Sequence, residues 1–325
     1  MMLSRHKPVV KWLYLGYLLI FAMVIIGGIT RLTGSGLSMA DWKPIMGAIP
    51  PLNETDWQAK FELYKATPEF KIINKDFALG DFKSIFWWEF IHRDLGRLIG
   101  LIFIIPFIIF WIQKRFDSSL LNKMFIILGL GAFQGLLGWY MVSSGLVNKP
   151  HVSHFRLAAH LSTALIAMLY IYWVALTLSY PQKTPHNGIK KKTIILTLLI
   201  IVQIIYGAFT AGLKAGYGNS IFLDIFNIPN LHNIFNNGTT ILFIHRYLGL
   251  SILGYTIYLY FSSSKDKQLL AHQKKGLIII VTLVIVQVSL GITTLLYNVP
   301  LSLGVLHQAT AVLTITACIY SIRRS

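Results

Sequence analysis

Four histidines lie inside apolar segments of the chain that are long enough to cross a membrane. They are His92, His160, His245 and His307. An ionisable side chain is costly to place in the hydrocarbon interior, so each of them is a functional candidate. Paired imidazoles that face one another across two helices are suited to bind the iron of a porphyrin. The four together favour haem or another metal cofactor, whereas any one of them alone could instead form an interhelical hydrogen bond.

The histidines belong to two copies of one sequence pattern. The segment Ile91-His92-Arg93 recurs 153 positions later as Ile244-His245-Arg246. The same offset relates further residues: Leu95 and Gly96 to Leu248 and Gly249, and Gln134, Leu137 and Gly138 to Gln287, Leu290 and Gly291. A fixed offset of this kind predicts a duplicated four-helix unit. We expect two halves, residues 1–182 with one histidine pair and residues 183–325 with the other.

Composition predicts an all-α polytopic membrane protein. The chain has 325 residues, of which 55% are apolar and only 13% are charged, and its mean hydropathy is +0.62. These values lie outside the range of soluble globular domains. A helix needs about 20 mainly apolar residues to cross the hydrocarbon core. Eight such segments are expected, at 12–28, 86–112, 124–142, 157–179, 193–213, 241–261, 277–297 and 301–321.

The charge distribution predicts the topology. A formal net charge of +17 would suggest nucleic acid as a partner for a soluble protein. Here the basic residues gather in alternate loops and at both ends, as the positive-inside rule requires, so no nucleic-acid partner is expected. Both termini are then cytoplasmic, and the long loop of about residues 29–85 faces outward. The first apolar segment lacks a signal-peptide cleavage site and should remain as a helix. No Arg/Ser-rich transit segment precedes it, which favours the bacterial inner membrane over an organelle.

The same topology predicts where the histidines lie. The second, fourth, sixth and eighth helices run from outside to inside, and each histidine lies about six residues, roughly 9 Å, below the outer end of its helix. The two halves are then parallel repeats, unlike the inverted repeats of many transporters, and both haem sites lie toward the outer face. Nearby glycines would let a flat ligand or a neighbouring helix approach: Gly96, Gly100, Gly249 and Gly254.

Glu89 distinguishes the first half from the second. It precedes His92 by three positions and so shares a helix face with it, whereas the equivalent position holds Leu242. We interpret this difference as one half keeping a cofactor while the other carries out chemistry that needs a carboxylate. Such a group could transfer protons or stabilise a developing cation. The alternative is a structural ion pair with Arg93 or Arg97.

Basic residues near the outer helix ends are candidate partners for haem propionates through charge-assisted hydrogen bonds. They are Arg31, Arg93, Arg97, Arg156 and Arg246. Snorkelling toward lipid headgroups explains Arg31 and Arg156 almost as well. His151, His154 and His232 fall in outer loops, where a solvated surface position is the simpler interpretation, although His151 and His154 remain candidate minor contributors. The single cysteine, Cys318, excludes an intramolecular disulfide and a cysteine-based metal site.

These residues resemble the haem A synthases of bacteria and mitochondria. The resemblance runs in order along nearly the whole chain, in GGITRLTGSGLSMADWKPIMGAIPP (27–51), EFIHRDLGR (89–97), QGLLGWYMVSSGL (134–146), RLAAHLSTA (156–164), NIFNNGTTILFIHR (233–246) and VLHQATA (305–311). It implies an eight-helix membrane oxidoreductase that converts the C8 methyl group of haem O into the formyl group of haem A. Haem O is then the substrate, and haem O synthase and cytochrome oxidase assembly factors are expected partners.

The resemblance also implies roles for individual residues. It assigns a haem b cofactor to His245 and His307, the substrate haem to His92 and His160, and the catalytic carboxylate to Glu89. Successive oxidations would pass through an alcohol and a hydrated aldehyde, with electrons leaving through the haem b half. This chain lacks the outer-loop cysteine pair of some family members, and the resemblance gives no role to Lys214 or Asp224.

Two other classes of function fit the histidine pairs. One is a dihaem electron carrier that resembles a membrane cytochrome b and turns over no substrate. The other is a haem transporter or chaperone. The contrast between Glu89 and Leu242 favours the enzyme, because a pure carrier has little use for a carboxylate in one half only.

Overall fold

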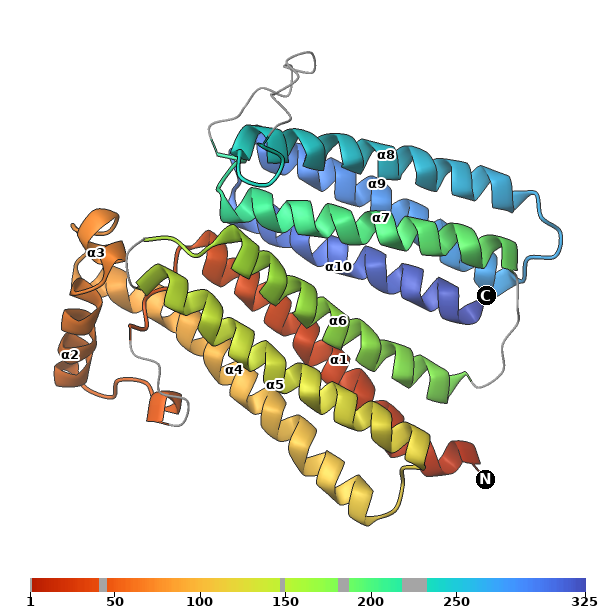
Figure 1. Cartoon of the computed structure of the whole chain (residues 1–325), viewed down its shortest axis with the longest axis horizontal. Helices are drawn as coiled ribbons and strands as arrows, with labels where there is room; N and C mark the ends of the chain where they lie inside the picture. The colour runs from red at the N-terminus through yellow and green to blue at the C-terminus, as the bar shows by residue number, and fades with distance from the viewer. Residues whose placement is uncertain (1, 41–45, 147–149, 181–186, 218–232) are drawn as a thin grey trace. The chain divides into compact units, whose positions relative to one another are not determined.

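The computed structural model describes the chain except for residues 1, 41–45, 147–149, 181–186 and 218–232 (Figure 1). In the described part, every regular element is a helix, which confirms the all-α prediction. The elements are α1 (Met2–Leu32), the 3₁₀ helix η1 (Met46–Ala48), α2 (Glu54–Lys65), α3 (Pro68–Ile72), α4 (Leu79–Ile112), α5 (Ser118–Leu146), α6 (His154–Ser179), α7 (Asn187–Gly212), α8 (Gly238–Ser264), α9 (Ala271–Leu296) and α10 (Leu301–Arg324).

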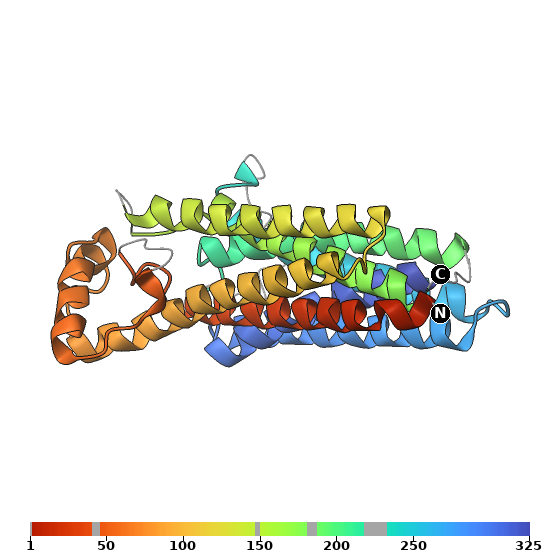
Figure 2. The same ribbon diagram turned by 90° about the horizontal axis from the view of Figure 1, so that it is seen from below.

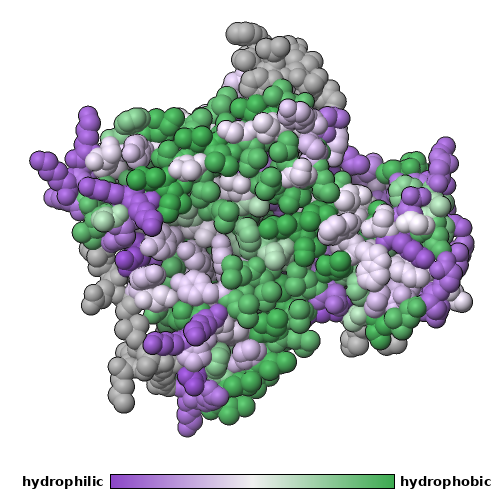
Figure 3. Space-filling view, turned by 180° about the vertical axis from the view of Figure 1, so that it is seen from behind, coloured by the Kyte–Doolittle hydropathy of each residue, from purple (hydrophilic) through white to green (hydrophobic). Residues whose placement is uncertain are grey.

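Eight of these helices, α1 and α4 to α10, are long and apolar enough to cross a membrane. Their spans contain 24 to 34 residues, against the roughly 20 that a bilayer requires. Large apolar side chains on them stay exposed, including Leu18, Leu101 and Phe261, and Figure 3 shows broad hydrophobic areas on the surface. Exposed apolar area of this extent suits contact with lipid. The chain is therefore a multi-pass membrane protein.

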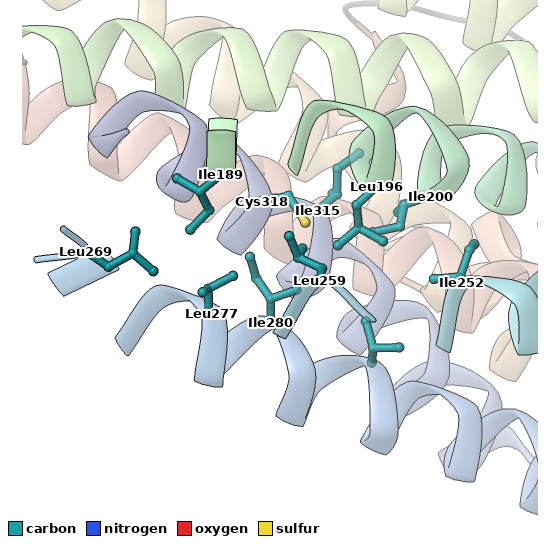
Figure 4. Packing of buried hydrophobic residues seen from close by; sticks show 11 residues of the cluster. Ile189, Leu196, Ile200, Ile252, Leu259, Leu269, Leu277, Ile280, Ile315 and Cys318 are labelled. Atoms are coloured by element: carbon teal, nitrogen blue, oxygen red, sulfur yellow. The ribbon is translucent and has the colours of Figure 1, made fainter. Parts of the chain in front are cut away.

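One compact unit comprises residues 1–17 and 165–325. Within it α7 packs on α8 and α10, and α9 packs on α8 and α10. The interior between these helices is apolar and includes the fully buried Leu196, Ile280 and Cys318 (Figure 4). Hydroxyl groups attach the start of α1 to the unit, because Tyr17 Oη lies 3.0 Å from Thr316 Oγ1. The division into residues 1–182 and 183–325 stays a prediction.

The second compact unit comprises residues 18–164. Figure 1 and Figure 2 show α2 and α3 beside the first turns of α4. Polar caps begin both short helices: Asn53 accepts from the Asp56 N–H at 2.8 Å, and Thr67 precedes Pro68, which suits a first helical turn. An aromatic cluster then joins α2 to α4: Trp57, Phe61, Tyr64, Phe82, Phe86 and Phe90.

Tyr64 fixes α3 within this segment. Its hydroxyl donates to Glu69 Oε2 at 3.2 Å and accepts from Asn74 Nδ2 at 2.8 Å. Burial raises the pKa of the Tyr64 phenol above its usual value, and the neighbouring Glu69 charge raises it further. The phenol therefore stays protonated and can keep donating to the carboxylate.

The aromatic packing also lengthens α4. This helix begins at Leu79 rather than near residue 86, because Phe82 and Phe86 pack on α2 and the Ala78 N–H is satisfied by Asp81 at 2.9 Å. His92 consequently lies thirteen residues after the helix start rather than about six. His160 and His307 do lie six residues after the starts of α6 and α10. The expected depth measured from the helix end was therefore wrong for His92.

Candidate functional site

His245 on α8 and His307 on α10 form a close pair of rings. Their ring centroids are 6.3 Å apart and the planes are inclined by 79°. The Nδ1 atom of each ring is buried and has no hydrogen-bond partner among the described residues. A packing histidine normally satisfies its buried nitrogens. The Nε2 atoms do lie near amides of neighbouring helices, 3.5 Å from Gln203 Nε2 for His245 and 3.4 Å from Gln287 Nε2 for His307. The interhelical hydrogen bond that explains many lone membrane histidines is thus present only as a long contact at Nε2 and not at Nδ1.

The spacing of this pair fits an iron porphyrin. Two imidazoles bound to opposite sides of one metal ion, each with a metal–nitrogen bond of about 2.0 Å, would have ring centres about 6.3 Å apart. The observed centroid distance is the same. Among the described residues no three His, Cys, Asp or Glu side chains gather to hold a metal ion. The iron of a porphyrin needs no such cluster, because the porphyrin nitrogens supply the iron ligands that the two histidines do not.

His92 on α4 and His160 on α6 are the corresponding residues of the other unit. Both lie in the unit of residues 18–164. His92 Nδ1 is also buried without a hydrogen-bond partner in the described part of the chain. His160 differs, because Gln134 Nε2 lies 3.1 Å from its Nδ1 and 3.3 Å from its Nε2.

Each of the four histidine rings lies against a glycine of the preceding membrane helix. A Cβ atom on Gly27, Gly138, Gly207 or Gly291 would stand 3.0, 3.1, 3.1 or 2.9 Å from the Cε1 atom of His92, His160, His245 or His307, respectively. At Gly291 this distance is shorter than real Cβ atoms essentially ever show, and at the other three glycines it is tighter than nine in ten real Cβ contacts, so the ring or the helix would have to shift. These glycines therefore make the space in which the imidazoles are held.

The glycines expected from sequence have other surroundings. Gly96 faces Met23 and Gly249 faces Gln203, at 3.3 and 3.2 Å from the Cβ position, so both admit a neighbouring helix. Gly100 and Gly254 have no atom within 4 Å of that position. No neighbouring helix of the described residues approaches these two glycines, and the approach of a flat ligand to them stays a prediction. The signal that could have found the four ring-packing glycines is a Gln or Met four residues before each of them.

Glu89 is 2% exposed and is held by three donors. Ser38 Oγ donates to its Oε2 at 2.6 Å, and the Met39 N–H donates to the same oxygen at 2.8 Å. Its Oε1 accepts from Arg93, which pairs with it one helical turn away and also donates to the Met39 carbonyl oxygen at 3.2 Å. The ion pair that sequence offered as an alternative is therefore present.

This network fixes the orientation of the carboxylate, because its two oxygens accept hydrogen bonds from a hydroxyl, an amide and a guanidinium. The loop that follows α1 supplies two of the three donors, so it positions Glu89 as closely as α4 does. Leu242, at the equivalent position, packs instead with Ala215 and Leu295. One unit thus holds a buried negative charge next to a histidine, and the other unit is apolar there.

The chain matches the family described as cytochrome oxidase assembly protein over residues 10–319. It is 44% identical to a haem A synthase of Flavobacterium psychrophilum, over 99% of both chains. It is 41% identical to a haem A synthase of Nitrosomonas eutropha, over 99% of this chain and 94% of the relative. The chain belongs to the haem A synthase family.

The arginines that the sequence suggested for propionates have varied surroundings. Arg93 pairs with Glu89, and Arg97 lies 3.5 Å from Asp94 in a partly exposed pair. Arg156 donates to the Tyr140 carbonyl oxygen at 2.7 Å and lies 3.7 Å from the centre of its ring. Arg31 is in the last turn of α1, and Arg246 follows His245 on α8. Their roles toward propionates stay predictions.

The other candidates from sequence are two histidines near the start of α6, Lys214 after α7, and two residues of the segment between α7 and α8. His154 begins α6 and packs its ring on Phe155 at 4.1 Å, and His151 is exposed. Lys214 takes a left-handed backbone conformation (φ 53°) just after α7, which ends that helix. His232 and Asp224 lie outside the described residues.

Proposed function

We propose that this protein is a haem A synthase that oxidises the C8 methyl group of haem O to the formyl group of haem A. Membership of the haem A synthase family supports the activity. The single structural observation that carries the proposal is the buried Glu89 charge beside one histidine pair and its replacement by Leu242 beside the other. A protein that only carried electrons would gain nothing from this difference.

In this proposal haem O binds in the N-terminal half. His92 and His160 hold its iron, which fixes the macrocycle between α4 and α6 and places the reacting methyl group relative to the protein. Orientation of this kind lowers the barrier because the reacting groups no longer need to be brought together. The glycines Gly27 and Gly138 keep both rings in place.

Glu89 then acts electrostatically. Loss of two electrons and one proton from the methyl group leaves positive charge at its carbon, and water then adds its oxygen there and loses a proton to give the alcohol. A second step of the same kind gives the hydrated aldehyde, which loses water, and the four electrons pass through the haem b half to an external electron acceptor. A carboxylate that is already ionised and oriented stabilises this charge without reorganising during the reaction. The three donors hold the carboxylate in one orientation, and we favour charge stabilisation over proton transfer as its role.

The C-terminal half holds the cofactor in this proposal. His245 and His307 would bind haem b, whose chemistry is reversible one-electron transfer and which would accept electrons from the N-terminal half. The surrounding interior is apolar, with Leu242 packed by Ala215 and Leu295. At the position equivalent to Glu89, the described side chains are therefore apolar, which suits retention of a haem.

The location follows from the distribution of basic residues. We infer the bacterial inner membrane, with both termini cytoplasmic and both histidine pairs toward the outer side. Haem O synthase, as the source of the substrate, and assembly factors of cytochrome oxidase, as acceptors of the product, are the partners that this reaction requires.

The test is direct conversion by the purified protein. Full-length protein in detergent is incubated with haem O and an electron acceptor, and the haems are extracted and separated by chromatography with mass detection. We expect a product with the mass of the formyl compound and retention of haem b. Unchanged haem O beside a normal haem b spectrum would favour a dihaem electron carrier instead.

A further inference from the structure

The four histidine sites share one local arrangement with a single exception. Four residues before each ring-packing glycine, the preceding helix carries a side chain that reaches the histidine-bearing helix. This side chain is a glutamine at three sites, namely Gln134, Gln203 and Gln287, and it is Met23 at the site of His92. The exception therefore falls on the histidine that also lies beside Glu89.

The glutamines tie the histidine-bearing helices to their neighbours. Gln203 Nε2 donates to the His245 carbonyl oxygen at 2.8 Å, and Gln134 Nε2 donates to the His160 carbonyl oxygen at 3.0 Å. Gln287 Nε2 lies 3.4 Å from Nε2 of His307. Hydrogen bonds between membrane helices are modest individually, yet groups around a metal ligand control its orientation and its affinity for the metal.

Met23 occupies, beside α4, the position that Gln203 occupies beside α8, but it donates no hydrogen bond to the histidine-bearing helix. The Met23 methyl group lies 3.3 Å from a Cβ on Gly96, just as Gln203 Nε2 lies 3.2 Å from a Cβ on Gly249. A thioether has no hydrogen to donate, and methionine adapts its shape through three rotatable bonds. Among the described residues, the His92 carbonyl oxygen consequently has no hydrogen bond from a side-chain amide of the preceding membrane helix, as the His160 and His245 carbonyl oxygens do. The bond from α1 to this part of α4 comes instead from Thr30 Oγ1 to the Trp88 carbonyl oxygen at 3.2 Å, one turn before His92.

We propose that Met23 makes His92 the exchangeable iron ligand of the N-terminal half, so that a haem bound there can leave, whereas the C-terminal half, where Gln203 and Gln287 contact both ligands, retains its haem. This inference rests on the proposed function, in which the N-terminal half takes haem O and releases haem A. Met23 is thus a positioning residue, which acts on the macrocycle through His92. A site that must release its product needs one ligand that detaches, and a cofactor site does not.

The experiment measures haem dissociation rather than turnover. Full-length protein is loaded with haem O under anaerobic conditions without an electron acceptor, and excess apomyoglobin then captures the haem that dissociates. We expect a fast phase from the N-terminal half and a slow phase from the C-terminal half. Met23→Gln should slow the fast phase by about 3- to 10-fold, as one added interhelical hydrogen bond would. Met23→Leu, which adds no donor, is the matched control.

The reverse substitution tests the same rule in the other half. Gln203→Met should speed the slow phase by a similar factor and allow carbon monoxide to bind a fraction of the reduced haem b. Equal fast phases in Met23→Gln and Met23→Leu would overturn the inference. If Met23→Gln does not fold, the test rests on Gln203→Met alone. An unchanged slow phase in Gln203→Met then overturns the inference.

Failure of the proposed function has a different signature. His92→Ala should abolish the fast phase, because that phase reports haem held by the N-terminal half. If the wild-type protein shows no second haem, or if the fast phase survives in His92→Ala, then the assignment of the substrate site is wrong. The inference about Met23 then fails as well, because it concerns a haem that His92 holds.

Discussion

The N-terminal and C-terminal histidine sites repeat one arrangement and differ around a single residue. His160 and His307 have the same neighbours, a glutamine and a glycine four residues apart on the preceding helix. His92 and His245 do not: His92 has Met23 and Glu89 where His245 has Gln203 and Leu242. The differences between these sites are therefore concentrated around His92. We interpret this as a change, after duplication, in the residues around one histidine of the N-terminal pair.

The difference is also one of polarity. Around His92, a loop hydroxyl, a loop amide and an arginine hold a buried carboxylate. Around His245, the corresponding space is filled by Leu242 and its apolar neighbours. A buried charge is costly unless it is fully hydrogen-bonded, so a network of this kind persists where the charge is used. The comparison supports our proposal that the first site carries out the oxidation and the second retains a cofactor.

The largest expected effect comes from removing a cofactor ligand. His245→Ala or His307→Ala should abolish or strongly alter the haem b spectrum, because losing one axial ligand changes the spin state and the redox potential of the iron. Absorbance and electron paramagnetic resonance spectra of the purified variants measure this. An unchanged low-spin spectrum in both variants would break the comparison at its C-terminal side.

Removing a substrate ligand should separate the two halves. His92→Ala is expected to retain haem b but to lose nearly all conversion of haem O, because the substrate is no longer held in a reactive position. Haem b content and haem A production are measured on the same preparation. Conversion at the wild-type rate would show that the N-terminal half is not the active site.

A smaller effect is expected at the glycines that face the rings. Gly207→Ala places a methyl group about 3.1 Å from His245 Cε1 and should weaken haem b retention about 10-fold, the lower end of the effects seen when groups around a metal ligand are changed. Gly254→Ala on α8 meets open space and is the matched control. Equal haem content in both variants would show that ring packing on glycine does not position the ligand.

The smallest effect should come from one donor to Glu89. Ser38→Ala removes the hydroxyl bond to Oε2 but leaves the Met39 amide and Arg93 in place. A loss of a few-fold in the rate of haem A formation is expected, since a hydrogen bond to a charged group contributes about 1.5–3 kcal/mol when nothing replaces it and less when other donors remain. A rate as low as that of His92→Ala would show that the hydroxyl has a further role.

The sequence predicted the spans and the histidine pairs for physical reasons that act locally. Apolar length determines which segments can cross a membrane, and a histidine within such a segment is conspicuous whatever surrounds it. The Glu89 network was not predictable, because Ser38 and Met39 lie in a loop whose path depends on tertiary packing. The early start of α4 was missed for a similar reason: Phe82 and Phe86 are stabilised by α2, which is distant in sequence.

The glycines and glutamines near the histidine rings were only partly predictable from the sequence. Gln134 and Gln287 were visible as matching residues at the 153-position offset, but Gly27 and Gly207 are separated by a different interval, because the segment between α1 and α4 is longer than that between α7 and α8. A search at one fixed offset therefore misses them. Their function became clear only when each was seen against a histidine ring.

In our proposal the N-terminal half oxidises haem O and the C-terminal half retains a cofactor, and the charge of Glu89 is the feature that the oxidation requires. The most direct measurement is haem extraction from Glu89→Gln, which keeps the shape but removes the charge, beside Glu69→Gln, which alters a buried glutamate of α3. The account predicts normal haem b in both, loss of haem A on the order of 10²-fold in Glu89→Gln only, and accumulation of haem O or its alcohol. Wild-type haem A production by Glu89→Gln would contradict it.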